Sequence, residues 1–85
     1  MPSRPTEAVG QQRFAMDLRF RIDTAVTYPS KRNIEEAVAL ARSQPASLAS
    51  RHVQHNLGKR RLAWLTTHGI PASIRTDMTV PDITT

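Results

Sequence analysis

The side chains best suited to chemistry lie together between Arg51 and Arg61. This segment, RHVQHNLGKRR, holds four cations, two histidines, a glutamine and an asparagine. Cationic groups bind phosphates, whereas amide and imidazole groups form hydrogen bonds with base edges. The segment therefore predicts a nucleic-acid-binding site, and a solvated helix face is the alternative. Phosphate contacts are expected from Arg51, Lys59 and Arg60. Arg61 would join them unless packing near Trp64 holds it. Base or groove contacts are expected from His55 and Asn56.

Positive charge is unevenly distributed along the chain. The formal net charge is +5, yet residues 37–76 contain six cations and no carboxylate, while residues 1–36 are nearly balanced. A field of this kind favours a polyanion. Ten of the twelve cations are arginine, which suits bidentate contacts with phosphate and guanine. We expect a nucleic-acid partner, with DNA favoured over RNA, and positive charge that serves only solubility is the alternative.

The length and composition limit the chain to one small domain. It has 85 residues, of which 39% are hydrophobic, and chains of this size bury only about 60–65% of their unfolded surface. We expect a flexible arm over residues 1–12, one domain over residues 13–80 and a tail over residues 81–85. The absence of cysteine excludes a disulfide scaffold and a four-cysteine zinc module. The apolar runs are too short for a membrane span or a secretory signal, so we expect a cytoplasmic protein with no membrane partner.

Apolar side chains alternate with mostly polar ones from Phe14 to Tyr28. Alternation is typical of a strand with one buried face, and it predicts a strand here. A helix is the alternative, but it would leave Met16 and Phe20 facing away from its apolar stripe, which would consist of Phe14, Leu18, Ile22 and Ala25. The four aromatic side chains are expected to be buried and so not to stack on bases.

Two helices are predicted to follow. Ser30 or Asn33 is expected to cap a first helix, which Pro45 ends. Ser47 is expected to cap a second helix, which changes direction or breaks near Gly58. Glycine and proline end this second helix at Gly69 and Pro71.

A weaker alternation predicts a short second strand over residues 74–80, so the predicted fold is α+β, with both helices on one face of a small sheet. Strand edges of such a sheet are unpaired, which predicts a homodimer. The order strand, helix, helix over residues 14–68 is similar to that of ribbon-helix-helix regulators, which lay a two-stranded ribbon in the major groove of DNA. This resemblance implies that Asp17, Arg19 and Arg21 face DNA, and it adds Arg19 and Arg21 to the candidate site.

The residue types give little support to catalysis or metal binding. Glu35 and Glu36 are neighbours and point apart on a helix, and no serine lies in a nucleophile motif. His52 and His55 could offer two metal ligands, but no carboxylate lies between Glu36 and Asp77 to support them. We expect no enzyme activity, metal or cofactor.

Together these features predict a dimeric DNA-binding regulator or an antitoxin-type repressor. The alternative is a small protein-binding module or inhibitor whose cationic half docks on an acidic partner protein.

Overall fold

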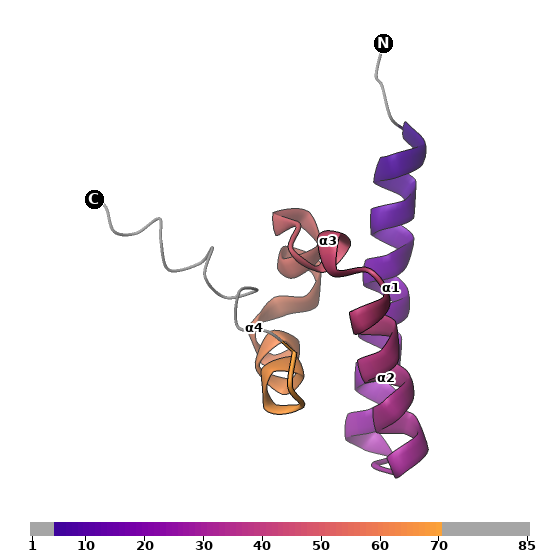
Figure 1. Ribbon diagram of the computed structural model, residues 1–85, viewed down its shortest axis with the longest axis vertical. Helices are drawn as coiled ribbons and strands as arrows, with labels where there is room; N and C mark the ends of the chain where they lie inside the picture. The colour runs from indigo at the N-terminus through magenta and orange to yellow at the C-terminus, as the bar shows by residue number, and fades with distance from the viewer. Residues whose placement is uncertain (1–4, 71–85) are drawn as a thin grey trace, which may run out of the picture.

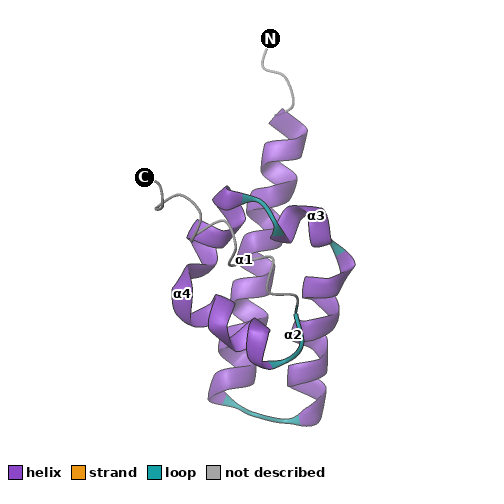
Figure 2. Ribbon diagram, turned by 60° about the vertical axis from the view of Figure 1, so that its left-hand side comes forward, coloured by secondary structure: helices purple, strands orange, loops and turns teal. Residues whose placement is uncertain are grey.

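The computed structural model describes residues 5–70, and the side chains of residues 9–70. This part of the chain folds into four helices: α1 (Pro5–Thr27), α2 (Lys31–Ser43), α3 (Pro45–Leu48) and α4 (Arg51–Thr67). Helices α1 and α2 run antiparallel side by side, α3 follows at the end of α2, and α4 passes along α1 with a change of direction midway (Figures 1 and 2). Among these helices none has the length and hydropathy that crossing a membrane requires.

The α+β prediction is wrong, because residues 14–28 belong almost entirely to α1 and residues 5–70 contain no strand. The alternation arises from a helix with apolar side chains on two opposite faces. Leu18 and Ile22 are buried on one face, whereas Met16 and Phe20 are 62% and 69% exposed on the other. The ribbon-helix-helix architecture, which needs that strand, is excluded with it. The second predicted strand, residues 74–80, lies outside the described residues, and α1 includes residues 5–12, which the sequence assigns to a flexible arm.

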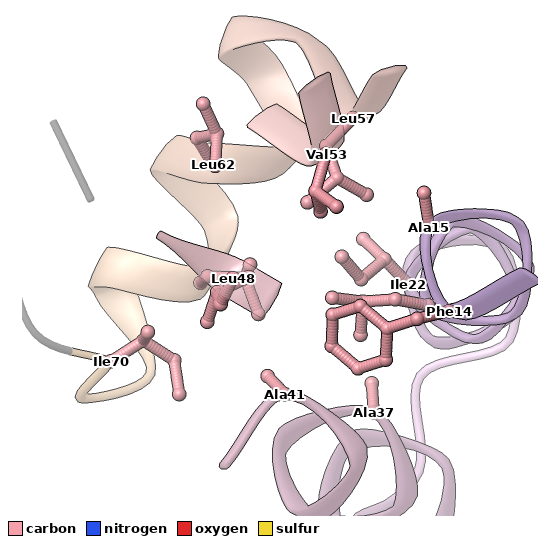
Figure 3. Packing of buried hydrophobic residues seen from close by; sticks show 12 residues of the cluster. Phe14, Ala15, Ile22, Ala37, Ala41, Leu48, Val53, Leu57, Leu62 and Ile70 are labelled. Atoms are coloured by element: carbon pink, nitrogen blue, oxygen red, sulfur yellow. The ribbon is translucent and has the colours of Figure 1, made fainter. Parts of the chain in front are cut away.

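One face of α1 forms the centre of the core. Its buried side chains point between α2 and α4 (Figure 3). The buried residues of α2, Ala37 and Ala41, are small, so this helix can approach α1 closely. The larger buried side chains come from α1, α3, α4 and the last described residue: Phe14, Leu18, Ile22, Leu48, Val53, Leu57, Leu62, Leu65 and Ile70. Burial of each stabilises the fold by about 1.5–3 kcal/mol.

Two serine caps determine where the longer of the last three helices begin. The Ser30 hydroxyl accepts a hydrogen bond from the backbone N–H of Asn33 at 3.0 Å, so Ser30, and not Asn33, is the N-cap of α2. The Ser50 hydroxyl accepts from the backbone N–H of Val53 at 3.5 Å and caps α4. Ser47, the cap predicted from the sequence, lies instead within the short helix α3.

Both predicted helix ends are confirmed. Helix α2 ends before Pro45. Helix α4 is closed by Gly69, whose φ of +89° is a left-handed conformation that glycine adopts without strain. The backbone N–H of Gly69 donates to the carbonyl of Thr66, and that of Ile70 donates to the carbonyl of Leu65, both at 3.1 Å. These two bonds form a Schellman motif, and Ile70 adds the apolar contact that usually accompanies it.

Helix α4 changes direction at Gly58, as the sequence predicts. Gly58 has φ +83° and ψ 163°, a combination that is essentially restricted to glycine. Leu62 lies nine positions after Val53, which corresponds to about two and a half turns of a straight helix. Their side chains would therefore point to opposite faces of a straight helix. The kink brings both onto the core, and both are buried (Figure 3).

We predict that Gly58→Ala and Gly10→Ala change stability in opposite directions. A Cβ at either position meets nothing within 4 Å, so space does not distinguish them. At Gly58 the backbone conformation becomes strained, which lowers the free energy of unfolding by about 1–3 kcal/mol. In the interior of α1, Gly10→Ala raises it by about 0.5–1 kcal/mol. Urea unfolding followed by circular dichroism measures both, and a Gly58→Ala protein as stable as the parent would contradict the role of the kink.

Candidate nucleic-acid interface

The predicted segment Arg51–Arg61 lies on α4, from its first turn across the kink. Its apolar side faces the core through Val53 and Leu57, which are fully buried. Gln54 is also buried, and its side-chain amide donates to the carbonyl of Leu48 at 3.2 Å. The exposed polar and charged residues of the segment are Arg51, His52 and His55 before the kink and Lys59 and Arg60 after it. We call these five residues the α4 cationic face.

Three cations of this face have no carboxylate partner among the described side chains, those of residues 9–70: Arg51, Lys59 and Arg60. The four carboxylates among residues 9–70 all belong to α1 and α2: Asp17, Asp23, Glu35 and Glu36. Because α4 has no acidic side chain of its own, its positive field is not neutralised by near neighbours on the helix.

Arg61 differs from its neighbour Arg60, because its guanidinium group is half-buried and bound to other parts of the molecule. Its Nε and Nη2 atoms donate to the two carboxylate oxygens of Asp23 on α1, at 2.9 and 3.0 Å. Its Nη1 atom donates to the carbonyl of Leu57, next to the kink, at 2.8 Å. The hydrogen bonds of Arg61 therefore connect the second half of α4 to α1 and to the first half of α4. Arg61 is not part of the α4 cationic face.

The other candidate arginines, Arg19 and Arg21, lie on α1 and not on α4. Arg21 pairs with Glu36 of α2, with 3.1 Å between Nη1 and Oε1, while Arg19 is exposed. Side chains two positions apart on a helix point in directions about 200° apart. These arginines therefore do not share a face, as they would on a strand. The structure thus turns them away from each other and places both on α1.

The remaining polar residues of the segment are positioned by the first half of α4. Asn56 is half-buried, and its Nδ2 atom donates to the carbonyl of His52 at 2.9 Å, whereas His55 is exposed. His52 was not among the predicted site residues, although its spacing of four residues from Asn56 predicts that the two side chains are neighbours on a helix. No three histidine, aspartate or glutamate side chains in the described range come together as a metal site.

Arg42, a further cation of the acid-free stretch, lies on α2 and not on the α4 cationic face. Arg42 of α2 lies at the C-terminal end of α4, where its Nη2 atom is 3.2 Å from the position that a Cβ on Gly69 would occupy. A cation is favoured there because the last carbonyls of a helix are partly negative. Arg75 lies outside the described residues.

Comparison with protein-family models, curated proteins and solved structures finds no match to this chain.

We predict that the pair formed by Arg61 and Asp23 contributes to stability. Arg61→Ala removes three hydrogen bonds from a charged donor and is expected to lower the free energy of unfolding by about 1–2 kcal/mol. Asp23→Ala removes only the ion pair, which is partly exposed, and should cost about 1 kcal/mol or less. In a double-mutant cycle by urea unfolding, additive effects would show that the two side chains do not interact.

Proposed function

We propose that this protein is a small DNA-binding regulator that contacts the phosphate backbone of duplex DNA through the α4 cationic face. The observation that carries the proposal is the exposure of Arg51, Lys59 and Arg60 on the two halves of α4, without a carboxylate partner among the side chains of residues 9–70. A cytoplasmic location is part of the same proposal.

The shape of α4 supports this choice of ligand. With its side chains a helix is about 10–12 Å wide, and the major groove of DNA admits an element of that width. The buried side of α4 is packed against the core, whereas the α4 cationic face is exposed and can contact a ligand. His52 and His55 lie on that face, and imidazole groups can donate to or accept from groove edges.

The energetics of phosphate binding set the expected affinity profile. Each phosphate contact releases a condensed counterion, so the logarithm of the binding constant falls with the logarithm of salt concentration with a slope of roughly −0.9 per contact. Three cations of the α4 cationic face predict a slope of about −2.7. Binding should be weak at physiological salt, because so few contacts supply little electrostatic free energy.

We predict that K59A/R60A weakens binding to duplex DNA and reduces the magnitude of the salt slope by about 1.8. The matched control is K31A/R32A, which removes the same two charges from another exposed Lys-Arg pair, at the start of α2. That control should leave the slope nearly unchanged, since its residues lie outside the α4 cationic face. Fluorescence anisotropy with a labelled duplex at several salt concentrations measures both variants.

Three outcomes would contradict the proposal. Equal losses in the two variants would show that net charge alone attracts the duplex. Binding to double-stranded RNA or to single strands, with none to duplex DNA, would assign the face to another nucleic acid. No binding to any of them at about 20 mM salt, where phosphate contacts are strongest, would favour the second candidate, a module that docks on an acidic protein.

A further inference from the structure

Helix α1 has a second apolar stripe, on the side opposite its buried face. Val9, Met16 and Phe20 are 54%, 62% and 69% exposed. They recur at intervals of seven and four residues, so they point in nearly the same direction on a helix. Leu18 and Ile22, which are buried, point the other way. Three large apolar side chains aligned along one helix form the kind of surface that marks an interaction site.

The stripe belongs to a longer pattern with coiled-coil spacing. Intervals of four and three residues alternate along it, as they do between the core positions of a heptad repeat. The residues at these positions, which we call the α1 seam, are Val9, Arg13, Met16, Phe20, Asp23 and Thr27. The seam has a cation in its first half and a carboxylate in its second half, with the largest apolar residues between them.

We propose that the α1 seam pairs with the seam of a second copy of this chain, in an antiparallel arrangement about a two-fold axis. With the axis level with Leu18, Met16 lies opposite the partner's Phe20, and Arg13 lies opposite the partner's Asp23. A two-fold contact of this kind is self-complementary, so each pair occurs twice. A parallel arrangement would instead place Arg13 opposite the partner's Arg13 and Asp23 opposite the partner's Asp23. Repulsion between these like charges disfavours the parallel arrangement.

The surroundings of the seam are compatible with this contact. Helices α2 and α4 pack on the buried face of α1 (Figures 1 and 2). They also reach the edges of the seam, where Arg61 of α4 pairs with Asp23 and Phe20 lies beside Asn33 and Glu36 of α2. The Asp23 side chain is 52% exposed while it accepts from Arg61, and a carboxylate has acceptor sites for a second guanidinium. Asp17 and Arg19 flank the seam. The two-fold axis places each of them beside the same residue of the second copy, at the solvent-exposed rim. Screening by salt keeps the repulsion between these like charges small there.

This inference does not depend on the proposed function, since it uses only α1. It also replaces the earlier basis for a homodimer, which was the unpaired edge of a strand that the described residues do not contain. Arg61 of α4 contacts the seam at Asp23, so a dimer through the seam would lie beside the second half of α4.

Sedimentation equilibrium of the full chain tests the dimer. At about 100 µM, where a dissociation constant in the low micromolar range or below gives mostly dimer, the expected mass is twice the 9.5 kDa of one chain. M16A/F20A should return the mass to that of one chain. V26A/Y28A is the matched control, because it removes two side chains that are 56% and 69% exposed outside the seam, and it should remain dimeric. Because all four side chains are exposed, circular dichroism should show unchanged helix content.

Single cysteines test the orientation, since the natural chain has none. In the antiparallel pair, Asp17→Cys places two thiols near the axis, and mild oxidation should link the chains. Val9→Cys places them about 27 Å apart, at 1.5 Å per residue along the two helices, and should give no link. Cross-linking of Val9→Cys alone would show a parallel pair. A protein that stays monomeric in every experiment, or that binds anionic phospholipid vesicles through Met16 and Phe20 instead, would overturn the proposal.

Discussion

The buried face of α1 is the surface on which the other helices are assembled. Leu18 and Ile22 are fully buried, and α2 and α4 both pack on this face of α1. A chain of this length has little apolar surface to bury, and no cysteine is present to link its segments. The fold therefore depends on one helix that packs against two others at once, and this is why α2 contributes small side chains such as Ala37 where it meets α1.

The kink in α4 connects this packing to the proposed function. A straight α4 could place only one of its two apolar stripes on the core, whereas the backbone at Gly58 lets both pack. Arg61 then joins the two halves of α4 to Asp23 of α1. With one arginine committed to this internal contact, Arg51, Lys59 and Arg60 remain on the outer side of α4, where they can meet phosphate.

The two faces of α1 have different roles in packing and in the proposed dimer. One face holds the monomer together, and the other offers Met16 and Phe20 to a second copy. Helix α4 reaches the second face at Asp23 through Arg61, but the cations proposed to meet DNA and the seam residues proposed to meet a second copy are different side chains. The proposed nucleic-acid contact and the proposed dimer can therefore fail or succeed independently, although together they would present two cationic helices related by a two-fold axis.

Local backbone chemistry is what the amino-acid sequence determined by itself. Proline and glycine end α2 and α4 near Pro45 and Gly69, and glycine breaks α4 at Gly58, because these residues restrict or permit backbone angles whatever surrounds them. The acid-free stretch of positive charge is likewise a property of the chain alone.

Packing decided the rest. From Phe14 to Phe20 the apolar residues alternate, and a helix with two apolar faces produces the same pattern as a strand with one, so only contacts with α2 and α4 select the helix. The caps show the same limit, since Ser47 and Ser50 have the same side chain and only the geometry of the turn selects Ser50. Arg60 and Arg61 are identical neighbours in sequence, yet only Arg61 meets Asp23, a residue 38 positions away. Tertiary structure alone brings such distant groups together, because their separation along the chain carries no information about their distance in space.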